Sequence, residues 1–123
     1  MRERLFLLQQ NNVISINSAN YCLDVARFIS QEFALTEDNE QLQMAITHLA
    51  RAYDRIIAGE IIKDGLEITL YKEVVNDPAY QIIIHLHHEI TRLLHLDKIP
   101  ETEEGFLLNN WLSLYYAAKE INC

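Results

Sequence analysis

Glycine, proline and cysteine are scarce in this chain of 123 residues, which has three glycines, two prolines and two cysteines. Because glycine and proline interrupt regular structure, their scarcity favours long helices joined by short connections. Cys22 and Cys123 form neither a disulfide framework nor a CxxC pair, so we expect a reducing compartment, the cytoplasm. There is no phosphate-cradling glycine loop, dinucleotide fingerprint or nucleophile elbow. We therefore expect no enzymatic activity and no cofactor.

Long hydrophobic runs and basic clusters are also missing. No apolar run approaches the roughly 20 residues of a membrane span, and the N-terminal MRERLFLLQQNN has an apolar run too short for a signal peptide. The net charge is −8, and the ten lysines and arginines are scattered along the chain. Such a chain repels nucleic acid. We expect neither membrane insertion nor direct binding of nucleic acid.

The sequence is rich in apolar residues (50 %), enough for one compact globular domain. Their helical spacing predicts an all-α bundle of five or six helices. We expect residues 1–14 to form a short N-terminal helix with its connection, and residues 15–123 to form the helical domain. Residues 66–75 fit a strand by composition and a helix by spacing; we favour the helix because no partner strand is visible.

Capping residues predict where the helices begin and end. We expect Asn17 or Ser18 to cap the first long helix, and Thr36 or Asp38 to cap the next, which should stop near Gly59.

Asp77 followed by Pro78 should start another helix, which runs to about His95. The last helix should begin at Glu101 or Thr102, with Glu101, Glu103 and Glu104 as carboxylates in its first turn.

The segment THLARAYDRIIAG, residues 47–59, is the most informative. His48, Arg51 and Arg55 fall at i, i+3 and i+7, which places them along one stripe of a helix beside its apolar face. A neutral imidazole can accept a phosphoryl group, and guanidinium groups suit the charge that results. The same pattern is also typical of a solvated helix face, and both interpretations stay open.

Four further histidines lie in HLHHEITRLLH. Two metal ligands could come from His85 with His88 at i+3, or from His85 with Glu89 at i+4. The simpler interpretation is a solvated polar face, because there is no HExxH motif and no second helix with paired ligands. We therefore expect no metal site and keep a metal-binding protein as the second alternative.

The order of three motifs resembles the PRD, the phosphotransferase-system regulation domain of bacterial antiterminators and operon activators. They are H-x-x-x-A-x-x-R-x-x-x-G from His48 to Gly59, the turn and helix at Asp77-Pro78-Ala79-Tyr80, and P-x-x-E-x-G-F-L from Pro100 to Leu107. The resemblance covers roughly residues 40–115.

This resemblance implies a helical bundle that dimerises and carries two histidines phosphorylated by components of the sugar phosphotransferase system. The first family histidine falls on His48, and Arg55 matches the arginine that follows it. Asn110 stands where the second histidine is expected, and Thr47 replaces an aspartate that usually precedes the first. An asparagine cannot accept a phosphoryl group. Two interpretations are open. Either phosphorylation at one site regulates the protein, or the fold is retained and the site is no longer phosphorylated.

We accordingly expect a stand-alone, PRD-like regulatory protein in phosphotransferase-linked control of transcription or sugar metabolism. His48 would receive a phosphoryl group from the histidine phosphocarrier or an enzyme II component, with Arg51 and Arg55 holding the charge. The first alternative is a phosphorylation-incompetent dimerisation or protein-binding module. Since no output domain is visible, the chain should act on an output protein that the sequence does not name.

A homodimer is expected, and three C-terminal aromatic residues are candidates for its contact. Together with Ile84, which lies off the main apolar stripe of its helix, Trp111, Tyr115 and Tyr116 could form an exposed apolar surface. The opposite interpretation places Trp111 and Tyr115 in the core, with Tyr116 alone at the surface.

Overall fold

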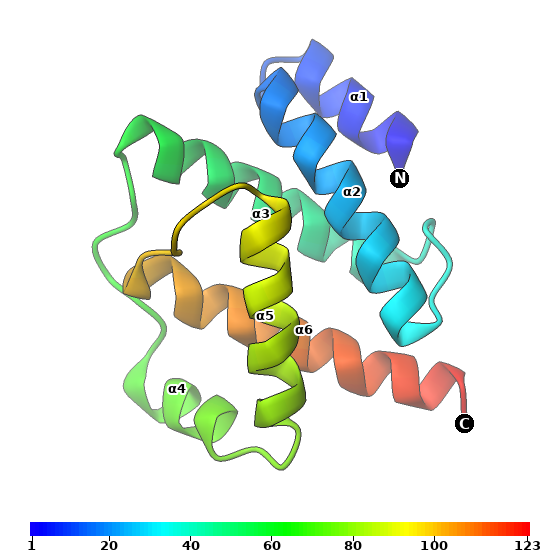
Figure 1. Cartoon of the computed structure of the whole chain (residues 1–123), viewed down its shortest axis with the longest axis vertical. Helices are drawn as coiled ribbons and strands as arrows, with labels where there is room; N and C mark the ends of the chain where they lie inside the picture. The colour runs from blue at the N-terminus through cyan, green and yellow to red at the C-terminus, as the bar shows by residue number, and fades with distance from the viewer.

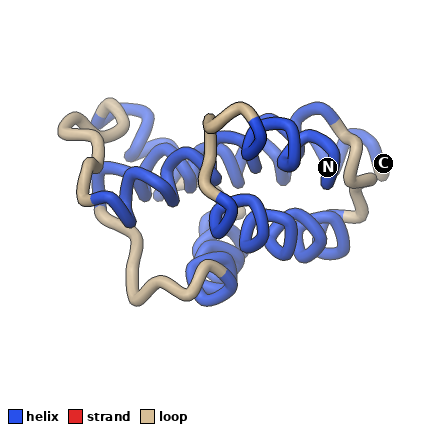
Figure 2. Tube along the Cα trace, turned by 90° about the horizontal axis from the view of Figure 1, so that it is seen from above, coloured by secondary structure: helices blue, strands red, loops and turns tan.

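The computed structural model describes all 123 residues, which form six α-helices and no strand (Figures 1 and 2). The helices are α1 (Arg2–Gln10), α2 (Ile16–Phe33), α3 (Glu40–Ala58), α4 (Ile68–Val75), α5 (Tyr80–Leu93) and α6 (Glu101–Ile121). The prediction of an all-α bundle is confirmed, and the ambiguous segment 66–75 contains helix α4. None of the helices combines the length and apolar character needed to cross a membrane.

The four longest helices pack around one another, and the two shortest lie at the edges. Helix α2 contacts α3, α5 and α6, while α6 also contacts α3 and α5. Helix α1 packs on α2, and α4 packs on α6 at the opposite side of the molecule (Figure 1). A single core includes buried residues from every helix, and Leu5 and Ile14 of the N-terminal segment belong to it.

Helix α3 is strongly amphipathic, which explains both its burial and its exposed stripe. Apolar residues at helical spacing bury one side against the bundle: Leu42, Ala45, Ile46, Leu49, Ala50 and Tyr53. The helix ends at Gly59, as predicted, and this residue has the left-handed φ of +72° that glycine adopts without strain. The edge of α3 that carries His48 faces α6.

The predicted cap of α2 is wrong by two or three residues. Ser15 is the cap, and its hydroxyl accepts a hydrogen bond from the Ser18 backbone N–H. Ser15 also donates its own hydroxyl and backbone N–H to the carboxylate of Asp54 on α3. Ser18 is buried and donates its hydroxyl to the Ala50 carbonyl oxygen instead. Contacts with α3 therefore decide which serine caps the helix.

Helices α3 and α5, by contrast, begin later than predicted. Asn39 caps α3 by accepting a hydrogen bond from the Leu42 N–H, so neither Thr36 nor Asp38 is the cap. Asp77 accepts a hydrogen bond from the Ala79 N–H within a turn, and α5 starts only at Tyr80. In each case an Asn or Asp side chain satisfies the free backbone donors of a helix start or a turn.

The three C-terminal aromatic residues do not form a common exposed surface. Trp111 is fully buried in the core, and Tyr115 is partly buried against it. Tyr116 is exposed and donates its hydroxyl hydrogen to the Asp77 carboxylate. Of the two interpretations, the one that places Trp111 in the core is therefore confirmed, because its indole fills the interior between α5 and α6.

Candidate functional site

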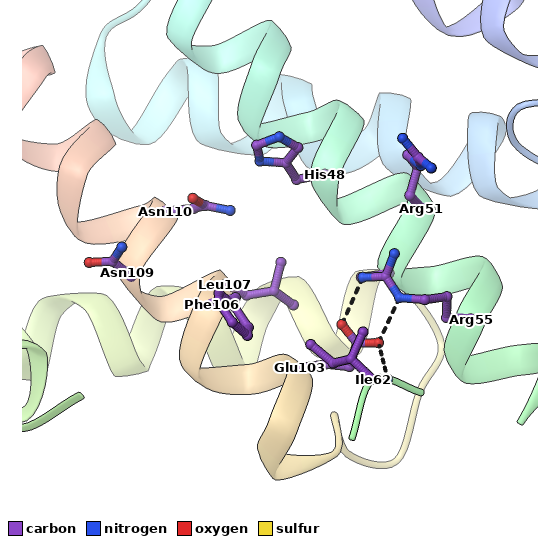
Figure 3. Close-up of a pocket in the computed structure, with 10 residues that line it drawn as sticks. His48, Arg51, Arg55, Ile62, Glu103, Phe106, Leu107, Asn109 and Asn110 are labelled. Atoms are coloured by element: carbon purple, nitrogen blue, oxygen red, sulfur yellow. Dashed lines mark hydrogen bonds and ion pairs between the residues drawn. The ribbon is translucent and has the colours of Figure 1, made fainter. Parts of the chain in front are cut away.

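A pocket of about 350 Å³ opens between α3 and α6 (Figure 3). Helix α3 supplies one wall and α6 the other, and the loop after α3 contributes a single residue. The lining residues are His48, Arg51, Ala52, Arg55, Ile62, Glu103, Phe106, Leu107, Asn109 and Asn110. Its volume lies within the range of small-molecule sites, near the lower end.

The four site residues predicted from the sequence all line this pocket. His48, Arg51 and Arg55 lie on successive turns of α3, and Asn110 lies on α6 on the other side (Figure 3). His48 and Asn110 also line a smaller adjoining hollow of about 90 Å³ between the same helices. His48 matches the first histidine in the resemblance to the PRD, and Asn110 stands at the position of the second. The two side chains therefore line the same pocket.

Arg55 is bound to a carboxylate at one end of the pocket. Its Nε donates to Glu103 Oε2 and its Nη2 donates to Oε1, both at 2.9 Å. The side chain of Glu103 is only 2 % exposed, whereas that of Arg55 is 35 % exposed. The hydrogen bonds to Glu103 raise the pKa of Arg55, which keeps the guanidinium charged. Nη1 of Arg55 takes part in neither bond and is left for another acceptor.

The chain around this ion pair is built to bring α3 and α6 together. Ile62 donates its backbone N–H to Glu103 Oε2 at 3.4 Å, so the loop after Gly59 also contacts the carboxylate. Gly105 lies against Leu66, where a Cβ atom would meet the Leu66 Cβ at 3.1 Å. Gly59, Arg55, Glu103 and Gly105 all belong to the motifs that resemble the PRD. Because these residues hold α3 and α6 together or end α3, the fold itself accounts for their presence in the motifs.

Arg51 is the cation of the pocket that has no carboxylate partner. It is exposed on α3, one turn from both His48 and Arg55, and it takes part in none of the ion pairs. Because Arg55 and Glu103 balance each other, the lining carries one positive charge in excess when His48 is neutral. An anion is the ligand that this charge favours.

Thr47 does not act on His48 in the way that the aspartate of the resemblance would. Its hydroxyl donates to the Gln43 carbonyl oxygen and accepts from Arg4 Nε, both at 2.8 Å. The His48 ring therefore has no carboxylate beside it in the sequence and none bonded to it in the structure. This hydroxyl instead joins α1 to α3.

Sequence reasoning missed several residues of the pocket. The sequence alone predicts Glu103 only as a carboxylate in the first turn of the last helix, and it predicts Phe106 as bulk for the core. The first is buried and paired, and the second is 39 % exposed at the pocket. Two of the motifs together held a signal for Glu103. One contains a basic residue, Arg55, and the other contains an acidic residue, Glu103, in a distant segment of the chain. Nothing local in the sequence marked Asn109 or Ile62.

The histidines of α5 divide into exposed and buried ones. His85 and His88 are exposed, and no group of three or more His, Cys, Asp or Glu side chains is placed to hold a metal ion. His87 is buried and accepts a hydrogen bond on Nδ1 from Trp111 Nε1 at 3.2 Å. Its proton is therefore on Nε2, which lies 3.3 Å from Glu104 Oε2. Burial lowers the pKa of His87 to about 4.

The pocket can hold a small anion beside an imidazole. Arg51 and the free Nη1 of Arg55 are positively charged hydrogen-bond donors. The side-chain amides of Asn109 and Asn110 are uncharged donors and acceptors. His48 is exposed, so a partner can reach its ring. The arrangement suits either a phosphoryl group attached to His48 or a free anionic ligand.

Over 120 residues the chain is 33 % identical to the uncharacterized protein YhfY of Escherichia coli (strain K12), and the alignment covers 98 % of each chain. The chain belongs to the YhfY family. The pocket lies within the part shared with YhfY, because the alignment leaves out at most a few residues. No protein-family model matches the sequence. No solved structure matches it either.

Proposed function

We propose that this member of the YhfY family is a regulatory protein similar to the PRD, switched by phosphorylation of His48. The observation that carries the proposal is the convergence of His48, Arg51, Arg55 and Asn110 on one pocket. The resemblance in sequence named His48, Arg55 and Asn110 from two segments far apart in the chain, and helical spacing added Arg51. The proposal assigns the protein to signalling in the cytoplasm and assigns it no catalytic activity.

In the proposed step His48 receives a phosphoryl group from a phosphohistidine of the phosphocarrier protein or of an enzyme II component. The lone pair of an unprotonated His48 nitrogen forms the new P–N bond while the P–N bond of the donor breaks. The donor ring takes up a proton and the His48 ring releases one, so charge and atoms balance. Arg51 and Nη1 of Arg55 then face the new charge of about −2.

The expected consequence is a change at a surface that binds another protein or a second copy of the chain. Met44 and Phe106 are exposed apolar side chains that line the two hollows beside His48. A new dianion between them changes both the charge and the hydration of this surface. We propose that this surface contacts the dimer partner or the output protein.

A second candidate is a dimerisation or protein-binding module in which His48 can no longer be phosphorylated. Asn110 cannot accept a phosphoryl group, and Thr47 is bonded to Gln43 and Arg4 and does not orient His48. Both observations favour this candidate, which retains the pocket and the dimer without the switch. A transfer assay distinguishes the two.

The test is phosphotransfer from a reconstituted chain of phosphotransferase proteins to the full chain. Wild-type protein should acquire an acid-labile label, and His48→Gln should acquire none. His85→Gln is the matched control, because it removes an exposed histidine outside the pocket and should label like the wild type. Equal labelling of wild type and His48→Gln would remove His48 from the mechanism. No label on any form would favour the second candidate.

A further inference from the structure

The pocket between α3 and α6 contains several polar side chains that the fold does not use. His48, Arg51, Asn109 and Asn110 line it, and none of their side chains forms a hydrogen bond within the protein. By contrast, Arg55 and Glu103 in the same pocket form two bonds with each other. The structural part of the site is thus separate from a set of polar side chains that line the pocket and have no partner within the protein.

The charge of these unused groups specifies part of the ligand. The molecule as a whole carries a net charge of −8, yet this pocket is lined by an unpaired Arg51 and by the free Nη1 of Arg55. Two guanidinium groups one turn apart can share the terminal oxygens of one phosphate. A doubly charged phosphate monoester therefore gains more from this pair than a single carboxylate does.

The uncharged part of the lining specifies the rest. Asn109 and Asn110 each offer an amide N–H₂ and a carbonyl oxygen, which can donate to and accept from hydroxyl groups. Phe106 exposes 39 % of its surface beside them and can cover the carbon skeleton of a ligand. The volume of about 350 Å³ restricts the ligand to a small molecule.

We infer that this pocket binds a free, hydroxylated organic phosphate monoester without forming a covalent bond to it. Arg51 and Arg55 bind the phosphate, Asn109 and Asn110 bind hydroxyl groups, and Phe106 contacts the carbon atoms. This goes beyond the proposed function, because it needs neither a phosphodonor nor a reactive His48. The bound phosphate and a phosphoryl group on His48 would compete for the same two arginines, so the two states exclude each other.

The experiment is a titration of the isotope-labelled, unmodified full chain, followed by amide chemical shifts and by calorimetry. The probes are glycerol 3-phosphate, ribose 5-phosphate and glucose 6-phosphate, with glucose, gluconate and inorganic phosphate as comparisons. At least one phosphate ester should bind saturably at millimolar concentration or below, and its shifts should centre on α3 and α6 around the pocket. Glucose, gluconate and inorganic phosphate should each bind at least about tenfold more weakly.

Two substitutions with the same change of charge test where the phosphate binds. Arg51→Gln should weaken binding of the ester about tenfold or more, since it removes a charge-assisted donor. Arg27→Gln removes an exposed cation from α2, outside the pocket, and should leave the affinity unchanged. Thermal unfolding followed by circular dichroism verifies that both variants are folded.

Four results would overturn the inference: no saturable binding of any of the esters, equal binding by inorganic phosphate or gluconate, equal binding by Arg51→Gln, or shifts confined to another part of the protein. The assay contains no phosphodonor, so its failure leaves the phosphorylation of His48 untouched. Conversely, a protein that never labels in the transfer assay can still bind the ester here. The two proposals therefore fail separately.

Discussion

The guanidinium of Arg55 donates two hydrogen bonds of 2.9 Å to the buried carboxylate of Glu103, across 48 positions of sequence. This pair joins the last turns of α3 to the first turn of α6 and forms one end of the pocket. A carboxylate that is removed from water needs this partner, because an unpaired buried charge is strongly unfavourable. The pair therefore supports the fold as well as the site.

Arg55→Gln should lower the free energy of unfolding by about 3 kcal/mol, the low end for a broken buried pair, because a third of the arginine side chain is exposed. The double substitution Arg55→Gln with Glu103→Gln should recover most of this loss, since two amides can bond to each other. Arg51→Gln is the matched control on the same helix and should change stability by less than about 0.5 kcal/mol. Urea unfolding measures all three, and an Arg55→Gln protein as stable as Arg51→Gln would contradict this role.

Two residues with the same left-handed backbone should respond oppositely to exchange of glycine and alanine. Ala34 ends α2 with φ +52°, and Gly59 ends α3 with φ +72°. No atom lies within 4 Å of a Cβ built at Gly59, so only backbone strain opposes a side chain there. Ala34→Gly should raise the free energy of unfolding by about 1 kcal/mol and Gly59→Ala should lower it by about as much. Changes of the same sign in both variants would disprove this account of the helix ends.

Buried His87 should make the protein less stable in mild acid. Burial lowers its pKa from 6.5 to about 4, so the unfolded chain binds a proton between these values and the folded chain does not. The contribution of neutral His87 to the free energy of unfolding is complete above pH 6.5. It is lost progressively as the pH falls towards 4, at about 1.4 kcal/mol per pH unit. Between pH 7 and pH 5 the loss should be about 2 kcal/mol.

Two neighbours of His87 affect this dependence, and a variant isolates its source. His88 lowers the pKa of His87 further by charge repulsion. Burial raises the pKa of Glu104, which acts in the opposite direction because protonation of this group in acid favours the folded state. His87→Gln keeps an acceptor for the Trp111 N–H and should flatten the dependence in urea unfolding at the two pH values. An unchanged slope would show that His87 is not its source.

Asn110→His should create a phosphoryl acceptor at the position where the proposed resemblance to the PRD places a second histidine. The new imidazole would line the same pocket as His48 and face the same arginines. In the His48→Gln background, which should not label, Asn110→His should therefore regain an acid-labile label in the transfer assay. Ser113→His, one turn along α6, is the control, because Ser113 lines only the smaller hollow and should stay unlabelled. Labelling of both double variants alike would show that position 110 has no special access to the donor.

The sequence could predict what depends on local spacing. The apolar period of α3 and its end at Gly59 follow from residues within the helix, and the same spacing predicted one stripe for His48, Arg51 and Arg55. Asn110 could be named only through the resemblance, because it lies on another helix. The structure places all four side chains in one pocket.

What the sequence could not predict depends on contacts between distant segments. Glu103 follows two other acidic or polar residues at a helix start and has the pattern of a solvated carboxylate, yet it packs against Arg55. His87 lies between two exposed histidines in sequence terms, and only the position of Trp111 on α6 explains its burial. Ser15 likewise displaced the expected caps because Asp54 of α3 bonds to it. Tertiary contacts override local preference in each case.

The most direct test of the central claim is to locate the phosphoryl group after transfer. The full chain is labelled by the phosphotransferase proteins, digested under mildly alkaline conditions that preserve phosphohistidine, and sequenced by tandem mass spectrometry. The account predicts phosphate on the peptide that carries His48 and on no peptide from α5. Phosphate on His85, His87 or His88 in place of His48 would contradict it.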